Sequence, residues 1–475
     1  MNDRVAKNYI FNLSYQALLA LVPLITQPYA SRVLGAKCLG EYSFTQSIVT
    51  YFVLLGSLGV NVYGQREIAF VQDDKDSRSK VFFELVFLKL ITVGITIVLY
   101  FMFVASTNSY KLLLLIQCLD LFATCLDITW FFQGMEEFKK IAIRNSIVKV
   151  SGVVFIFLFV KQPDDLPLYV LIYSLSLFLG NITLWMYVPK YINLKLHQNL
   201  NVFKHLKYTV WLFIPQVATC VYTVLDKTMI GIIINDTSSI GVYDCVQKII
   251  NLFLTVITSM GTVMLPRVSS YHASGNRLAL EKSIMNSFEF VFMLSFPMVF
   301  GIEIIADRFS GVFWGPDFIG AGVLTRILCL IILLAGLSNV TGTQYMVPTG
   351  KEKKFSLSII IGSIVNFFLN LVLIKRYGAV GACLASVIAE LVILMVQIII
   401  IRRELDVVTM LKRCKVYVIA SGIMALVIST INCFPNEMVN LVIQILLGIF
   451  VYFGSLFLFK EKLTMSILNK FWKGV

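Results

Sequence analysis

The sequence predicts an all-α, polytopic membrane protein with about fourteen transmembrane helices. Three properties of the 475-residue chain lead to this fold class: 58% of its residues are apolar, only 14% are charged, and its mean hydropathy is +0.83. A soluble domain contains roughly half apolar and a quarter charged residues. Apolar windows long enough to cross a hydrocarbon core of about 30 Å as a helix recur from end to end. Because a backbone in lipid is satisfied only in helices or closed barrels, such long runs are helical.

The predicted spans follow one another with short polar loops between them, and no hydrophilic domain interrupts the series. They cover residues 9–31, 41–63, 81–104, 110–133, 141–160, 166–188, 208–234, 240–264, 284–305, 319–346, 355–374, 379–401, 416–432 and 438–459.

The distribution of basic residues predicts the orientation. With the N-terminus in the cytoplasm, 28 of the 40 Lys and Arg residues fall in cytoplasmic segments and 7 in outside loops. This alternation supports an even number of helices and cytoplasmic N- and C-termini. It also explains the net charge of +13 as a topology signal, so that nucleic acid is not needed as a partner.

Residue patterns typical of enzymes are not found. The nine cysteines are scattered, mostly inside apolar runs, without a CxxC pair or a Cys/His metal spacing. His197, His205 and His272 all fall in predicted cytoplasmic loops, where a solvated surface role is expected. There is no phosphate-binding loop and no nucleophile–base motif. We therefore predict no catalytic residue, no metal site and no cofactor.

An internal repeat divides the chain. The second and eighth spans both read G-x-Y-x-x-x-Q-x-I-x-x-x-F at an offset of 201, and the same offset pairs Arg66 with Arg267. Six spans separate the copies, so both copies have the same orientation and the repeat is parallel, as in two-lobed transporters with a site between the lobes. We predict an N-terminal lobe over residues 1–200 and a C-terminal lobe over 201–402. Residues 403–475 then form two peripheral helices and a cytoplasmic tail.

Polar side chains line one face of several spans. The first span carries Asn12 and Gln16 within a stripe at i, i+4 spacing, and the seventh, its equivalent in the second lobe, carries a stripe that includes Gln216 and Asp226. The eighth span adds Gln247 and Asn251. Polar groups inside a membrane usually face a cavity or one another. Interhelical hydrogen bonds are the alternative explanation. Stripes at equivalent positions in both lobes favour a shared aqueous cavity.

Charged residues inside the spans allow two interpretations. Lys89, Asp120 and Lys149 fall near the middle of the membrane in the first lobe, and Asp244 precedes Lys248 by one helical turn. These residues could form structural ion pairs. Alternatively, the basic residues could line a cationic lumen that accepts a phosphate group.

Several motifs resemble the polysaccharide transporter family, the lipid-linked oligosaccharide flippases of the multidrug/oligosaccharidyl-lipid/polysaccharide (MOP) superfamily. The motifs are residues 28–35 (PYASRVLG), 40–42 (GEY), 63–69 (YGQREIA), 127–136 (DITWFFQGME), 225–231 (LDKTMIG) and 377–382 (YGAVGA).

The resemblance implies two six-helix lobes around a central cavity that opens alternately to each side of the bacterial cytoplasmic membrane. It implies that the protein moves an undecaprenyl-diphosphate-linked repeat unit of capsule, O-antigen or a similar glycan to the outer leaflet. Implied partners are the lipid-linked oligosaccharide and membrane lipids, with a polysaccharide polymerase and glycosyltransferases as further candidates. The family's polar cavity positions map onto Arg32, Glu41, Arg66, Asp127 and Asp226.

The predicted site combines these positions with the intramembrane charges and amides. The candidate substrate-binding residues are Arg32, Arg66, Lys89, Lys149, Asn12, Gln16, Gln247 and Asn251. The candidate coupling residues are Asp226, Asp127 and Glu41. Without an ATP-binding motif, transport is passive or coupled to a Na⁺ or H⁺ gradient or to the membrane potential.

Other functions remain as alternatives. A drug/cation antiporter of the same superfamily should have a more acidic, aromatic-lined cavity. A glycan polymerase usually carries a large outside loop, whereas the longest outside loop here is about residues 303–318. An O-acyltransferase is disfavoured because no histidine lies in a span. A purely structural scaffold does not explain the polar stripes.

The predicted orientation can be tested with reporter fusions. Fusions after Lys80 and Lys207 should report the cytoplasm, and fusions at Ser106 and Asn235 the outside, because basic residues concentrate in the first pair of loops. A reversed pattern would contradict the orientation.

Overall fold

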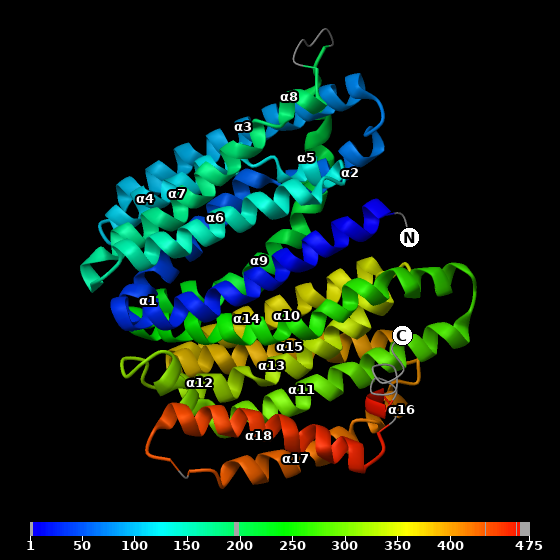
Figure 1. The fold of residues 1–475 in the computed structure, drawn as a ribbon. Helices are drawn as coiled ribbons and strands as arrows, with labels where there is room; N and C mark the ends of the chain where they lie inside the picture. The colour runs from blue at the N-terminus through cyan, green and yellow to red at the C-terminus, as the bar shows by residue number, and fades with distance from the viewer. Residues whose placement is uncertain (1–2, 194–198, 433, 462, 466–475) are drawn as a thin grey trace. The chain divides into compact units, whose positions relative to one another are not determined.

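A computed structural model describes residues 3–193, 199–432, 434–461 and 463–465 (Figure 1). The described residues contain helices and no strand, so the predicted all-α fold is confirmed. The chain divides into two compact units. The first unit comprises Met1–Gly231 and Asp236–Gly241, and the second comprises Ile232–Asn235 and Val242–Val475. The lobe boundary at residue 200 stays a prediction, because a division by contacts does not test a sequence repeat.

The helices of the first unit pack mainly around α1 and α4. In Figure 1, α4, α6 and α7 run side by side, and α4 also contacts α1 and α3. The helices are α1 (Asp3–Ser57), α2 (Val60–Phe70), α3 (Lys75–Ser106), α4 (Lys111–Leu126), α5 (Thr129–Gly134), α6 (Phe138–Phe159), η1 (Pro163–Asp165), α7 (Leu166–Trp185), α8 (Val188–Tyr191), η2 (Val202–His205) and α9 (Leu206–Ile234).

The second unit has α11 and α15 at the centre of its contacts. The C-terminal helices α17 and α18 pack on each other and on α11 (Figure 1). The helices are α10 (Thr237–Ala273), α11 (Arg277–Phe313), α12 (Ala321–Leu328), α13 (Leu330–Ser338), the π-helix η3 (Asn339–Met346), α14 (Glu352–Tyr377), α15 (Ala379–Ile401), α16 (Val407–Lys412), α17 (Lys415–Ser429) and α18 (Glu437–Leu458).

The predicted count of fourteen spans is not confirmed. In the described part of the chain, eleven helices are long and apolar enough to cross a membrane, or twelve if the bent pair 202–221 and 223–234 forms one span. Two features account for the difference. Helix α1 (Asp3–Ser57) contains the predicted span 9–31 and most of 41–63, as two helices joined across a kink at Gly35, where φ is 73° and ψ is 172°, so the pair counts once. Helix α17 has only 15 residues.

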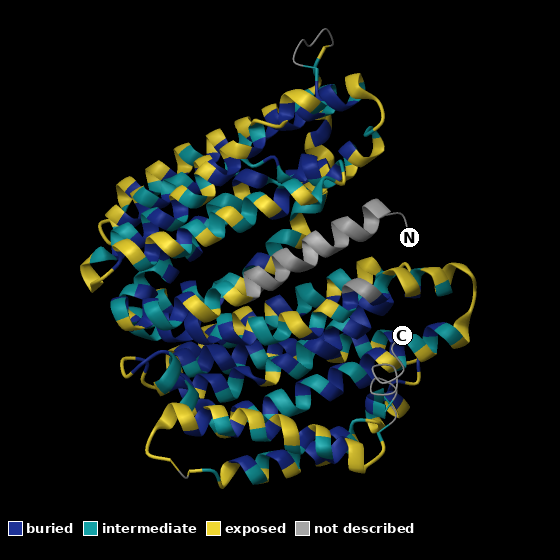
Figure 2. Ribbon diagram, viewed as in Figure 1, coloured by how far each residue is buried: buried dark blue, intermediate teal, exposed yellow. Residues whose placement is uncertain are grey.

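The outward faces of the helices are apolar, as expected where lipid replaces water. On α18, Leu446 is 63% exposed and Phe450 is 75% exposed, and this helix shows a yellow outer face in Figure 2. Its buried face instead carries Asn440, Gln444 and Tyr452. Large apolar side chains therefore point away from the protein while polar ones point inward, which is the pattern of a membrane protein.

Two of the family-like motifs meet where α2 crosses α5. A Cβ atom at Gly64 would lie 2.6 Å from the Trp130 ring, and one at Gly134 would lie 2.7 Å from the Gln65 carbonyl oxygen. Trp130 is buried and packs against Phe82 of α3. The two glycines therefore allow the close approach of these helices, which gives both motifs a structural role.

We predict that Gly64→Ala and Gly134→Ala each lower the free energy of unfolding by about 1–3 kcal/mol, because a methyl group would overpack the crossing. Thermal unfolding of the purified protein in detergent measures this. Gly94→Ala is the matched control, since a Cβ atom at Gly94 on α3 meets no atom within 4 Å. If Gly134→Ala is as stable as Gly94→Ala, the proposed crossing is wrong.

Candidate functional site

The predicted span 110–133 is interrupted by a break between α4 and α5. Helix α4 ends at Leu126, Asp127 has extended backbone angles, and α5 begins at Thr129. The Asp127 Oδ1 atom accepts a hydrogen bond from the Thr129 backbone N–H at 2.9 Å. A broken helix in a membrane leaves backbone groups without helical partners, so other groups must satisfy them.

Lys89 of α3 supplies the hydrogen bonds at this break. Its Nζ atom donates to the Asp127 backbone oxygen at 2.7 Å and to Asn61 Oδ1 of α2 at 3.0 Å. It also lies 3.5 Å from Asp127 Oδ2, forming an ion pair, and Lys89 is only 1% exposed. The ammonium therefore satisfies the backbone carbonyl and the carboxylate of Asp127, the residue after α4, and an amide oxygen of α2. The structure thus brings together two predicted site residues, Lys89 and Asp127.

A second buried polar cluster surrounds His205, at the end of η2. His205 Nε2 lies 2.9 Å from Glu84 Oε2, and His205 Nδ1 lies 2.9 Å from the Tyr63 hydroxyl. Glu84 also accepts from Lys204 Nζ at 2.8 Å and from the Asn201 backbone N–H at 2.8 Å. His205 is 2% exposed and Glu84 is fully buried. This cluster fixes the segment before α9 against α2 and α3.

The surface role expected for His205 is therefore wrong. Its partners, Tyr63 and Glu84, lie more than a hundred residues earlier in the chain, so local sequence gave no signal. Glu84, a carboxylate within the predicted span 81–104, was the one sequence feature that indicated the need for a buried polar partner. His272 is exposed, as expected, and His197 lies outside the described residues.

The other basic site residues of the first unit lie nearer its surface. Arg32 is exposed and its Nη1 atom donates to the Pro28 carbonyl oxygen at 2.9 Å. Arg66, with a side chain 50% exposed, pairs with Glu67 at 3.1 Å and lies over the Tyr63 ring. Lys149 of α6 is half-buried. Their role in substrate binding stays a prediction.

The remaining predicted residues fall into three groups. Asn12 and Gln16 lie outside the residues whose side chains the structure describes. Asp226 is buried and Glu41 half-buried in the first unit. In the second unit, Gln247 is half-buried and Asn251 exposed on α10.

The charged pairs predicted as a structural alternative are present in part. Asp244 Oδ2 lies 2.7 Å from Lys248 Nζ, one turn along α10. Of the residues predicted near the middle of the membrane, Lys89 bonds Asp127 and Asp120 bonds Gln46.

An ion cluster fixes the loop after η3 in the second unit. Glu404, which follows α15, accepts hydrogen bonds from Lys351 and from the Tyr345 hydroxyl. Burial alone would raise the pKa of the Glu404 carboxyl, but these two hydrogen bonds and the nearby positive charges hold its pKa below the ordinary value. The carboxylate is therefore charged near neutral pH and stabilises this end of the unit.

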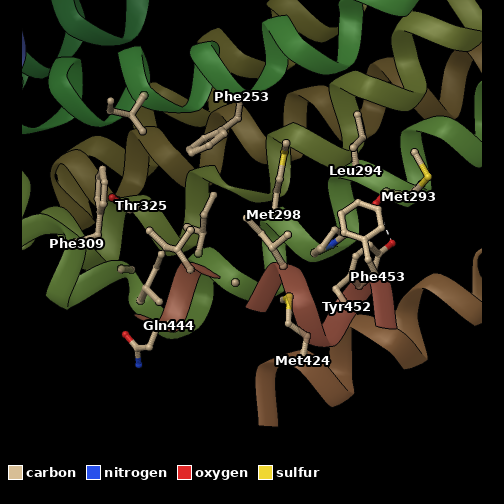
Figure 3. Close-up of a pocket in the computed structure, with 18 residues that line it drawn as sticks. Phe253, Met293, Leu294, Met298, Phe309, Thr325, Met424, Gln444, Tyr452 and Phe453 are labelled. Carbon is tan, nitrogen blue, oxygen red and sulfur yellow. Dashed lines mark hydrogen bonds between the residues drawn. The ribbon is translucent and has the colours of Figure 1, made fainter. Parts of the chain in front are cut away.

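The second unit also contains an apolar pocket of about 330 Å³ that the sequence did not predict (Figure 3). It lies between α10, α11, α17 and α18. Methionine and aromatic side chains, among them Phe253, Met298, Met424 and Phe453, point into it in Figure 3. Flexible methionines adapt to apolar ligands of irregular shape. The lining suits an alkyl or isoprenoid chain better than a sugar.

Comparison with known families identifies the relatives of this chain. Residues 5–272, more than half of the chain, match the family described as "Polysaccharide biosynthesis protein". The chain belongs to this family. It is 24% identical over 415 residues to a putative O-antigen transporter of Escherichia coli K12, covering 84% of this chain and 97% of the relative. A putative O-antigen transporter of Shigella dysenteriae is also 24% identical, covering 79% of this chain and 94% of the relative.

Solved structures confirm the fold. The inward closed conformation of the lipid II flippase MurJ superposes with a TM-score of 0.75 at 18% identity, covering 96% of this chain and 99% of that one. The multidrug transporter DinF-BH superposes with a TM-score of 0.58 at 17% identity, covering 85% and 96%. These likenesses show that the chain has the fold of such transporters, while its membership of the MOP superfamily stays a prediction.

The Lys89–Asp127 pair can be tested by a double-mutant cycle. Lys89→Met should lower the free energy of unfolding by about 3–5 kcal/mol, because it leaves the Asp127 carboxylate buried without its cation. Adding Asp127→Asn should recover much of this loss, since the second change removes the unpaired charge. Thermal unfolding in detergent measures all four proteins. Strictly additive effects would show that the two side chains do not interact.

Proposed function

We propose that this protein is a flippase that moves an undecaprenyl-diphosphate-linked oligosaccharide across the bacterial cytoplasmic membrane for surface polysaccharide synthesis. The observation that carries the proposal is the family match over residues 5–272, together with O-antigen transporters aligned over nearly their whole length. We propose that it is a multi-pass protein of the cytoplasmic membrane with both termini in the cytoplasm.

The proposed substrate has an anionic, hydrophilic head that cannot cross about 30 Å of hydrocarbon unaided. Basic side chains that remain accessible supply its positive partners. Arg32 and Arg66 are exposed, although Arg66 also pairs with Glu67, whereas Lys89 is enclosed and bonded to Asp127. Charge-assisted hydrogen bonds from a guanidinium to a phosphate oxygen are strong and geometrically specific. Amide side chains such as Gln247 and Asn251 would replace the hydration of the sugars.

The lipid part of the substrate has a different requirement. A polyisoprenoid chain needs only apolar surroundings, and the pocket among α10, α11, α17 and α18 offers them. Its volume of about 330 Å³ suits one segment of such a chain, while the rest stays in the bilayer. The head and the tail would then be bound by different surfaces of the protein.

The proposed cycle is alternating access, biased by an ion gradient or by consumption of the product. Any ion must bind with different affinity in two conformations to bias them. Asp226, Asp127 and Glu41 are the coupling residues proposed from the family resemblance, with Na⁺ or H⁺ as the ion. A polysaccharide polymerase and glycosyltransferases are proposed partners, because they would consume and supply the lipid-linked glycan.

Deleting the gene in its host tests the proposal. We expect loss of one surface polysaccharide and accumulation of its lipid-linked precursor, both restored by the intact gene. Arg32→Ala and Arg66→Ala should each reduce export about tenfold, since losing one charge-assisted contact costs about 1.4 kcal/mol or more. Immunoblots of surface glycan and precursor extraction measure the two quantities.

Arg376→Ala is the matched control, because Arg376 is an exposed arginine at the end of α14, in a predicted outside loop. It should support normal export. Unchanged polysaccharide in the deletion strain, with increased sensitivity to cationic drugs, would instead support the drug/cation antiporter.

A further inference from the structure

A buried cluster of one carboxyl and two amides lies in the first unit, away from the Lys89 and His205 clusters. Asp120 and Gln117 are on α4, Gln46 is on α1, and Ser174 of α7 faces Asp120. Asp120 is 6% exposed and Gln117 is fully buried. We call these four residues the Asp120 cluster.

The hydrogen bonds of the Asp120 cluster run in one direction. Gln117 Nε2 donates to Gln46 Oε1 at 3.0 Å, and Gln46 Nε2 donates to Asp120 Oδ2 at 3.2 Å. Within the described part of the chain, Asp120 Oδ1 and Gln117 Oε1 accept no hydrogen bond. The Ser174 hydroxyl is a further donor to the Asp120 carboxyl, but Gln117 Oε1 has no donor, and leaving a buried acceptor unsatisfied costs free energy.

No lysine or arginine compensates the charge of Asp120 among the ion pairs of the described residues. Lys89, a buried basic residue on the neighbouring helix α3, is bonded to Asp127. An ionised carboxylate buried without a cation is much more costly than a neutral acid. A proton on Asp120 removes this cost.

A proton would also correct the shortage of donors. Protonated Asp120 carries one O–H donor. Gln117 lies three residues before Asp120 on α4, the spacing that places side chains on the same helical face. The Gln117 Oε1 atom, which accepts no other hydrogen bond, is therefore the expected acceptor for this O–H group. One proton supplies the donor that Gln117 Oε1 lacks, whereas a metal ion would require several more oxygen ligands.

The surroundings of Asp120 are mostly neutral. Several titratable or charged side chains lie on α4 and on the helices packed against it. They are Glu41 of α1, Lys89 and Tyr100 of α3, Cys118 and Asp127 of α4, and Tyr169 and Tyr173 of α7. Tyrosines and a buried cysteine are neutral at neutral pH, and Asp127 is paired with Lys89. Glu41 is half-buried, so Asp120 is the carboxyl of this group that is buried without an ion pair.

We propose that Asp120 is a proton-binding residue of the transport cycle, protonated while the Asp120 cluster is sealed and deprotonated when water reaches it. The step is a simple dissociation: the O–H bond of the carboxylic acid breaks, the electron pair stays on the carboxylate, and water takes the proton. This inference rests on the proposed flippase function. It adds a residue outside the coupling set proposed from the family resemblance.

The first test needs no substrate. Infrared spectra of the purified wild-type protein near neutral pH should contain the C=O stretch of a buried carboxylic acid, and Asp120→Asn should remove it. Glu437→Gln, which changes an exposed carboxylate of the second unit, should leave the band in place. A band that survives Asp120→Asn, or no such band in the wild type, would overturn the proposal.

The second test measures coupling in vesicles that contain the purified protein and a lipid-linked oligosaccharide. An imposed pH gradient should accelerate flipping by the wild-type protein, while Asp120→Asn should flip at the same rate with and without the gradient. Asp120→Glu should keep the response, because it retains a titratable carboxyl. Because an asparagine amide preserves the shape and acceptor of the neutral acid, Asp120→Asn is expected to fold, and its unfolding temperature checks this.

The outcomes separate the two proposals. If the wild type flips no lipid-linked oligosaccharide, the proposed function fails. If the wild type flips it but responds only to a sodium gradient, or Asp120→Asn responds to the pH gradient as the wild type does, Asp120 is structural and this inference alone fails. A misfolded Asp120→Asn leaves the decision to Asp120→Glu, whose loss of the pH response in a folded protein would equally contradict the proposal.

Discussion

The contact between Lys89 and the break at Asp127 determines how the first unit is organised. Lipid offers no hydrogen bonds, so a helix can be interrupted in the membrane only if protein groups satisfy the freed backbone and polar atoms. Lys89 does so by bonding the Asp127 carbonyl, the Asp127 carboxylate and Asn61 of α2. The break lets α5 turn against α2, where Gly64 and Gly134 permit close packing. A single buried ammonium thus supports the region that contains two of the family-like motifs.

The sequence predicted the fold class and most spans because lipid imposes a simple length and hydropathy rule on each helix. The sequence did not predict where the helical backbone is kinked or interrupted. The helix kinks at Gly35, between two predicted spans, and the break after Leu126 depends on a lysine 38 residues away in the chain. Such features arise from tertiary contacts, and hydropathy does not record them.

The candidate site shows the same limit more clearly. Composition and family resemblance pointed to Arg32, Arg66 and Lys89 as one class of basic residue, but the structure separates them by burial: Lys89 is enclosed, while both arginines are accessible. His205 and the apolar pocket were missed, since their partners come from distant segments. Asp120 was recognised as an intramembrane acid, yet only its contacts reveal that it lacks a cation and has amide neighbours.

The most direct measurement of the central claim uses vesicles that contain this protein alone. A diphosphate-linked oligosaccharide and the same oligosaccharide on an uncharged lipid anchor are placed in one leaflet, and the accessibility of the sugar from the other side is followed with time. Flipping well above that of protein-free vesicles for the diphosphate-linked form, and much slower flipping of the uncharged form, is the predicted result. Equal rates for both forms would contradict recognition of the anionic head, and no movement above protein-free vesicles would contradict the flippase function itself.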